Sequence, residues 1–284
     1  MYDTLESRDS TLMIDALKQL GTEIEISGTT VMVTPRPLTG PASIDCGLAG
    51  TVMRFVPGVA ALATGEITFD GDAAARKRPM KTTVDSLRAL GVSVSGESLP
   101  FAISGTGFVS GGEIAIDASA SSQFVSGLLL VGARFDQGLT VSHVGEHLPS
   151  MPHIEMTIDC LQKRGVVAAQ TGEASWRVEP GEISGGERRI EPDLSNAGPF
   201  LAAAMVAGGS VRISNWPKST TQVGDDFDGI LQRMGASIVR DGNDLVISGS
   251  GEIQGIDIDL SSGGELTPVT VSYTHLRAHE TVLD

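Results

Sequence analysis

The chain has 284 residues, of which 40% are hydrophobic and 35 are glycine, and its formal net charge is −15 at pH 7. This composition is typical of a globular protein with many tight turns, and so acidic a balance argues against nucleic acid as a partner. No apolar stretch is long enough to span a bilayer and the N-terminal MYDTLESRD does not resemble a signal peptide, so we expect a cytoplasmic protein with no membrane partner.

Similar helix ends recur at intervals of about 70 residues, which indicates one supersecondary unit copied along the chain. They are LKQLG at 17–21, LRALG at 87–91, LQKRG at 161–165 and LQRMG at 231–235. Two short strand-like runs follow, and then a helix that is apolar on almost all sides, at 52–63, 124–135 and 198–209. Such a helix has to be covered on both faces, so the pattern predicts a layered α/β fold that repeats helix, strand, strand, buried helix, strand.

The pattern also predicts a domain boundary and an unusual C-terminal segment. Residues 180–192, PGEISGGERRIEP, are rich in glycine and charge, as linkers usually are. We therefore expect a first domain over 1–185 and part of a second domain over 186–270. A further apolar helix should follow Thr267, yet the chain reads VSYTHLRAHETVLD from residue 271, so we expect 271–284 to be a non-native tail.

Each apolar helix begins with polar residues, at a position where backbone N–H groups and the helix dipole favour anions. The first helix start has Gly50 and Thr51, with the cation Arg54 one turn later. The second has SSQ at 121–123, and three polar groups exceed what a helix cap needs, so this start is predicted to bind a ligand. The third has Ser-Asn at 195–196, which we interpret as an ordinary cap.

Three further features suit an anionic ligand. The cluster RKRPMK at 76–81 is dense in cations for so acidic a chain, and arginine binds carboxylate or phosphate through a planar fork of donors. Ser150 precedes another helix start, where a serine is either a cap or a ligand-binding residue. Glu265 places a carboxylate where the other units have neutral polar groups.

Five motifs occur in an order that resembles the 5-enolpyruvylshikimate-3-phosphate synthase family, especially its actinobacterial members. They are LAGTVMRF at 48–55, RKRPM at 76–80, SSQF at 121–124, PSMPH at 149–153 and GELTP at 264–268. The resemblance implies two domains of βαβαββ units, incomplete in this chain, with shikimate 3-phosphate bound by the domain at 1–185. It also implies transfer of the enolpyruvyl group of phosphoenolpyruvate to the 5-hydroxyl of shikimate 3-phosphate, by a monomer that uses no cofactor and no metal.

The resemblance assigns roles to residues at matching positions. The phosphate of shikimate 3-phosphate is expected to be held by Ser121, Ser122 and Ser150. Phosphoenolpyruvate is expected to lie against Gly50, Thr51 and Arg78, with Arg54 in support.

Three other positions complete the expected site. The resemblance places Gln123 between the two substrates. It makes Glu265 the carboxylate that accepts the proton of the 5-hydroxyl, a role that suits a group in a closing cleft. His153 occupies a position where many relatives have tyrosine.

The resemblance further implies that segments of the family are missing. The PGSKS segment and its downstream arginine are absent at the front, and the lysine and arginines that should follow the Glu265 motif are absent at the back. We therefore expect a fragment truncated at both ends.

Other functions fit the residues less well. The related UDP-N-acetylglucosamine enolpyruvyl transferase uses a loop cysteine, but Cys46 lies on the wrong side of Gly50 for that role. RNA 3′-phosphate cyclases share a repeat of this kind, against which the acidic charge and the lack of a nucleotide motif argue. A non-catalytic module that binds one phosphorylated ligand stays open. Cys46 and Cys160 are otherwise expected to be reduced thiols.

The 284 residues alone are expected not to turn over at a useful rate. Loss of one preorganised charge donor costs roughly 10²–10³ in rate, and several donors are absent together. A phosphate-release assay with both substrates measures this, and robust turnover would contradict the expectation. Adding the flanking segments of the family should restore activity, which Arg78→Ala or Glu265→Ala should then largely remove.

Overall fold

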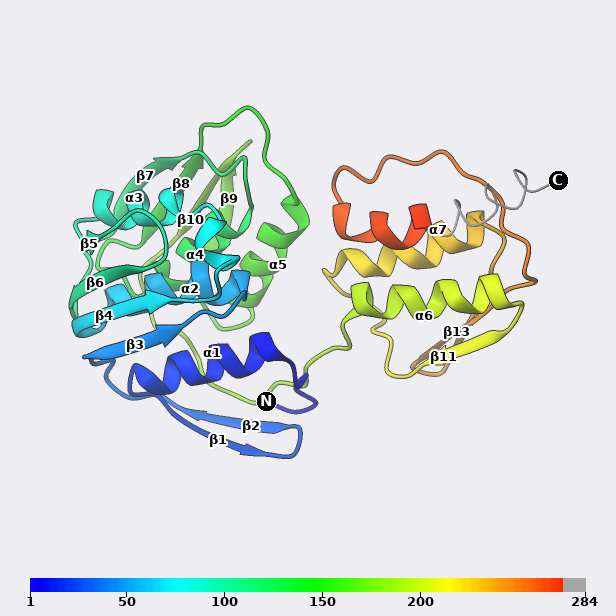
Figure 1. Cartoon of the computed structure of the whole chain (residues 1–284), viewed down its shortest axis with the longest axis horizontal. Helices are drawn as coiled ribbons and strands as arrows, with labels where there is room; N and C mark the ends of the chain where they lie inside the picture. The colour runs from blue at the N-terminus through cyan, green and yellow to red at the C-terminus, as the bar shows by residue number, and fades with distance from the viewer. Residues whose placement is uncertain (273–284) are drawn as a thin grey trace. The chain divides into compact units, whose positions relative to one another are not determined.

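The computed structural model describes residues 1–272, and the chain divides into two compact units, Met1–Ile190 and Glu191–Asp284 (Figure 1). Of the predicted non-native tail, residues 271 and 272 continue a helix that begins at 267, and the rest lies outside the described residues. Within residues 1–272, no helix combines the length and the apolar character needed to cross a membrane.

The first unit contains two complete copies of a βαβαββ motif, which confirms the expected fold class. The first copy consists of β3 (Ala42–Asp45), α2 (Gly50–Ala61), β4 (Thr64–Asp70), α3 (Lys81–Ala89), β5 (Ser93–Ser95) and β6 (Phe101–Thr106). Its four-stranded sheet has the order β3-β4-β6-β5, with β3 and β4 parallel and the other pairs antiparallel. A short 3₁₀ helix, η1 (Ala75–Lys77), precedes α3.

The second copy repeats this topology. It consists of β7 (Gly112–Ile116), α4 (Gln123–Gly132), β8 (Leu139–His143), α5 (Met151–Gln162), β9 (Ala168–Gly172) and β10 (Ser175–Val178). The sheet order is β7-β8-β10-β9, with β7 and β8 parallel. The helix α1 (Arg8–Gln19) and the hairpin of β1 (Glu23–Ser27) and β2 (Thr30–Thr34) complete the unit.

The sequence pattern missed the strand that precedes each apolar helix of this unit, β3 and β7. Both strands are short, and β3 alternates buried and exposed residues over only four positions, ASID. Four alternating residues do not distinguish a strand from a loop in a sequence. The predicted order of helix, strand, strand, buried helix, strand therefore lacked one strand per copy.

The second unit holds a smaller sheet with one long helix. Its elements are α6 (Leu194–Ala207), β11 (Ser210–Ile213), η2 (Val223–Asp226), α7 (Phe227–Arg233), β12 (Ser237–Asp241), β13 (Asp244–Ser248) and η3 (Gly264–Leu266). The sheet order is β11-β13-β12, all antiparallel. One face of α6 packs on the sheet and on η2 and η3.

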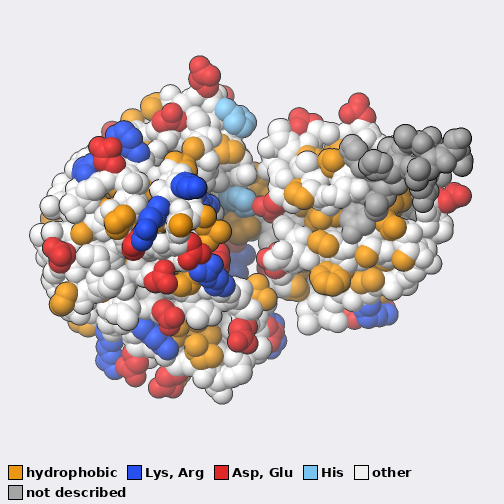
Figure 2. Space-filling view, in the orientation of Figure 1, with side chains coloured by type: hydrophobic (Ala, Val, Ile, Leu, Met, Phe, Trp, Pro, Cys, Tyr) orange, Lys and Arg blue, Asp and Glu red, His pale blue; other side chains and the backbone are white. Residues whose placement is uncertain are grey.

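The other face of α6 corrects a prediction, because this apolar helix was expected to be covered on both sides. Phe200 is 64% exposed and Val206 is 38% exposed. Figure 2 shows hydrophobic side chains on the visible surface of this unit. In the part of the second unit that the structure describes, α6 is covered on one face.

The two apolar helices of the first unit pack against each other in its interior (Figure 1). They approach closely because Gly127 of α4 has no side chain: a β-carbon there would lie 2.4 Å from the carbonyl oxygen of Arg54 on α2. Backbone cannot yield as a flexible side chain does. The glycine therefore sets the spacing of α2 and α4, and with it the spacing of the residues at their N-terminal ends.

Gly127→Ala is expected to lower the free energy of unfolding by about 1–3 kcal/mol, the usual cost of overpacking a core. Urea unfolding of the 284-residue chain measures this. Gly181→Ala is the matched control, since no atom lies within 4 Å of the position its β-carbon would take. Equal stability of the two variants would show that α2 and α4 can separate without cost.

Candidate functional site

Residues from three segments of the first unit meet at the N-terminal ends of α2 and α4. A β-carbon on Gly50 would lie 2.9 Å from Nη2 of Arg78 and 3.1 Å from Oε1 of Gln123. Gly50 begins α2, Gln123 begins α4, and Arg78 follows η1. The structure thus brings together three predicted site residues, and Gly50 has no side chain that would separate the other two.

Arg54, one turn along α2, contacts Gln123 of this cluster. Its side chain is buried, its Nη1 donates to Oε1 of Gln123 over 2.6 Å, and its guanidinium lies 5.0 Å from the ring centre of Phe124. Burial, together with the nearby charge of Arg78, lowers the pKa of Arg54 to about 10. The side chain is therefore still a cation at neutral pH.

The contact with Arg54 fixes which way the amide of Gln123 points. A guanidinium has only donors, so Gln123 must turn its oxygen toward Arg54. The NH₂ group of Gln123 then remains to donate to a ligand. This amide is consequently a donor to an anion rather than an acceptor.

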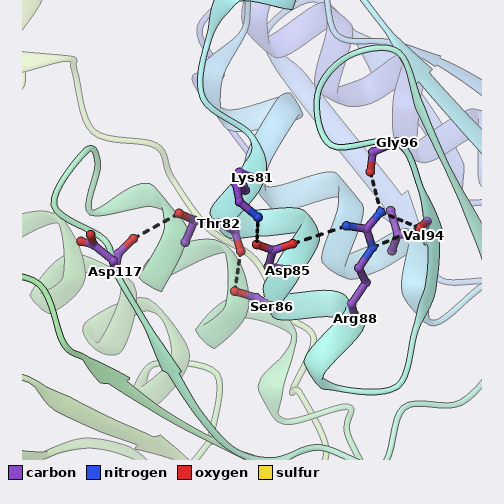
Figure 3. A network of polar contacts seen from close by, with 8 residues as sticks. All are labelled: Lys81, Thr82, Asp85, Ser86, Arg88, Val94, Gly96 and Asp117. Carbon is purple, nitrogen blue, oxygen red and sulfur yellow. Dashed lines mark hydrogen bonds and ion pairs between the residues drawn. The ribbon is translucent and has the colours of Figure 1, made fainter.

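The predicted basic cluster separates into residues with different roles, which the sequence did not distinguish. Arg76 binds both oxygens of Asp70, at 2.9 and 2.7 Å. Lys81 pairs with Asp85 one turn along α3 (Figure 3). Arg78 donates instead to the carbonyl oxygen of Leu48 at 2.9 Å.

Arg54 and Arg78 thus differ from their basic neighbours. Among residues 1–272, neither is paired with a carboxylate. Two guanidinium groups without acidic partners, one buried and one half-buried, make a local positive centre in an acidic protein. Such a centre suits phosphate or carboxylate groups.

Hydroxyl groups line the same helix starts. Ser122 is the buried N-cap residue of α4, but its side chain makes no capping hydrogen bond, and Ser121 Oγ instead accepts from the N–H of Gln123 at 3.3 Å. Ser150 is the N-cap residue of α5, with a left-handed backbone (φ 55°, ψ 55°) and no capping bond from its side chain. No hydrogen bond among the described residues uses the hydroxyl of Thr51, Ser122 or Ser150.

Ser150 and His153 lie at the start of α5, so the packing of this helix determines where they are. The N–H of His153 donates to the carbonyl oxygen of Ser150, and the hydroxyl of Thr157 reaches Ser126 of α4 at 2.9 Å in a buried contact. This contact fixes α5 against α4. In the described part of the chain, no hydrogen bond links Ser150 to Ser121 or Ser122 directly.

In the second unit, the predicted cap proved wrong. The cap of α6 is Asp193, whose Oδ1 accepts from the N–H of Asn196 at 2.9 Å. Ser195 donates instead to Oε1 of Glu265 at 2.7 Å. The sequence carried no signal for this contact, because the two residues are far apart in the chain and each is unremarkable alone.

Cys46 does not have the surroundings of a reactive thiol. It is fully buried, and burial together with Asp45 and Asp70 raises its pKa to about 12. Cys46 and Cys160 are both free. A thiol that keeps its proton at neutral pH is inert, which argues against a catalytic loop cysteine.

Comparison with known proteins shows the family of this chain. The family model described as EPSP synthase (3-phosphoshikimate 1-carboxyvinyltransferase) matches residues 1–284. A 3-phosphoshikimate 1-carboxyvinyltransferase of Kocuria rhizophila is 47% identical over 98% of this chain and 68% of its own length. The chain belongs to the EPSP synthase family. The resemblance inferred from the five motifs is therefore confirmed.

Solved structures support the fold of this EPSP synthase family member. Two structures of EPSP synthase from Acinetobacter baumannii match with a TM-score of 0.72 and 23% identity over 94% of the chain. The chain spans 63% and 62% of the length of these two proteins.

Arg54→Met is expected to raise the free energy of unfolding by about 1 kcal/mol, because it removes a buried charge that has no acidic partner. Arg88→Met is the matched control. Arg88 donates to the carbonyl oxygens of Val94 and Gly96 (Figure 3), so its loss should cost about 1–3 kcal/mol. Urea unfolding compares the two. Equal destabilisation by both changes would mean that Arg54 serves the fold rather than a ligand.

Proposed function

We propose that the first unit binds shikimate 3-phosphate, and that the chain is part of an enzyme that transfers the enolpyruvyl group of phosphoenolpyruvate to the 5-hydroxyl of that substrate. The observation that carries the proposal is the cluster of Arg54, Arg78 and Gln123 at the α2 and α4 starts, in a member of the EPSP synthase family. We further propose that the protein acts in the cytoplasm as a monomer.

The phosphate of shikimate 3-phosphate is assigned to the hydroxyls of Ser121, Ser122 and Ser150. Ser122 and Ser150 stand at helix starts, where backbone N–H groups and the helix dipole attract anions. Their side chains make no capping bonds, which leaves both hydroxyls ready to donate to phosphate oxygens.

Phosphoenolpyruvate is assigned to the neighbouring start of α2. Arg78 supplies a guanidinium without an acidic partner among the described residues, and Gln123 supplies its NH₂ group. Gly50, which has no side chain, lets the side chains of Arg78 and Gln123 lie against this helix start, with Thr51 next to it in the chain. Fixed donors of this kind stabilise charge that develops during reaction, because they need no reorganisation.

Glu265 is assigned the proton of the 5-hydroxyl. Ser195 donates to one carboxylate oxygen of Glu265 and so orients the group. In the proposed path the hydroxyl oxygen loses its proton to Glu265 and adds to C2 of phosphoenolpyruvate while a proton adds to C3, which gives a tetrahedral intermediate. Loss of a proton from C3 and departure of phosphate from C2 then restore the carbon–carbon double bond and complete the transfer. Mass spectrometry of the product formed from both substrates separates this transferase from a module that only binds.

Ser122→Ala is expected to weaken the affinity for shikimate 3-phosphate about tenfold, since hydrogen bonds to charged groups contribute about 1.5–3 kcal/mol. Calorimetry of the 284-residue chain measures this affinity. Ser43→Ala, at an exposed position of β3, is the matched control.

Shikimate without its phosphate provides a second control. The affinity for this compound should be the same before and after Ser122→Ala, because the hydroxyl is assigned to the phosphate. Unchanged binding of shikimate 3-phosphate in the variant would remove Ser122 from the site.

A further inference from the structure

His143, at the end of β8, makes an unusual contact outside the residues assigned above. Its Nδ1 accepts a hydrogen bond from the backbone N–H of Ala118 at 3.1 Å. An imidazole nitrogen accepts only when it carries no proton, so this contact requires the tautomer with its proton on Nε2. Nε2 is buried and has no hydrogen-bond partner among the described residues.

A buried donor without a partner costs free energy and calls for an explanation. The same ring accepts the N–H of Ala118 at its Nδ1. The orientation that leaves Nε2 without a partner is therefore the one that holds the peptide of Ala118.

Ala118 leads directly into the hydroxyl groups at the start of α4. Its carbonyl oxygen accepts from the N–H of Ser121 at 3.0 Å, and Ser121 Oγ accepts from the N–H of Gln123. A continuous series of hydrogen bonds therefore runs from His143 through Ala118 and Ser121 to Gln123. Ala118 is fully buried, so this turn is anchored in the core.

Two other contacts hold the residue before Ala118. The hydroxyl of Thr82, on α3, donates to the carbonyl oxygen of Asp117 at 3.1 Å (Figure 3). The hydroxyl and N–H of Ser119 bind the carboxylate of Asp117 and lower its pKa, so it stays ionised. These contacts fix the loop at residues 117 and 119. The N–H of Ala118, between them, is bound by His143 alone among the described residues.

We propose that His143 is a positioning residue, which holds the peptide of Ala118 and thereby sets the hydroxyl of Ser121 for the phosphate of the ligand. The inference rests on the proposed binding of shikimate 3-phosphate. His143 does not touch that ligand in this scheme, because it acts through the backbone.

Three variants of the 284-residue chain test the inference. His143→Asn keeps an acceptor, since its Oδ1 takes the place of Nδ1, whereas His143→Leu removes it. By calorimetry, the Leu variant should bind shikimate 3-phosphate about tenfold more weakly and the Asn variant within about twofold of the parent chain. His147→Leu, at an exposed position of the following loop, should bind as the parent does.

Rescue by asparagine distinguishes positioning from a general structural role. Equal affinities in the parent and Leu chains would overturn the inference, as would an Asn variant as weak as the Leu variant. If the Leu variant does not fold, His143→Gln replaces it, because its amide oxygen reaches the place of Nε2 rather than that of Nδ1. It should lose affinity as the Leu variant would.

A second measurement needs no ligand. The Ala118 amide should exchange its hydrogen slowly in the parent and Asn chains and faster in the Leu or Gln chain, as followed by nuclear magnetic resonance. Equal exchange in all of them would overturn the inference. If the parent chain shows this protection but binds no shikimate 3-phosphate, the proposed function fails while the role of His143 in holding the loop stands.

Discussion

The hydrogen bond between Arg54 and Gln123 is the contact on which the arrangement of the candidate site depends. It joins the two helices that form the centre of the unit, and it forms because the two backbones approach closely at Gly127. A buried guanidinium with an amide as its partner is costly for the fold, because the amide does not neutralise the charge. The chain accepts this cost at the place where its polar groups converge, as proteins commonly do at functional sites.

The helix starts at equivalent positions of the repeat differ in the charges of the side chains around them. In the first unit, cations and hydroxyl groups surround the starts of α2 and α4. In the second unit, the start of α6 carries two carboxylates, from Asp193 and Glu265. The helix starts of the first unit thus present donors that suit an anionic ligand, whereas the start of α6 already has carboxylates of its own chain beside it. The difference comes entirely from a few side chains, which explains how a repeated fold acquires separate chemical roles.

The sequence predicted the repeat and its apolar helices because a period of this length leaves many matching positions. It pointed to the candidate site through polar residues at helix starts, where backbone N–H groups attract anions whatever the sequence. The contact of Ser195 with Glu265 was not predictable, since it depends on tertiary packing between residues that no local pattern connects. The same holds for Arg76, which looks like Arg78 in sequence but is neutralised by Asp70 in the fold. The exposed face of α6 was missed because periodicity reports how apolar a helix is, not what covers it.

The absence of a carboxylate beside Arg54 and Arg78, within residues 1–272, also determines the selectivity expected of the proposed site. A cationic centre of this kind selects ligands by their negative charge more than by their carbon skeleton. Inorganic phosphate and sulfate have nearly the same oxygen geometry as a phosphoryl ester, so they are expected to compete for the donors of the proposed site. The affinity measured for an organic phosphate at the proposed site is therefore expected to fall as the concentration of phosphate or sulfate in the buffer rises.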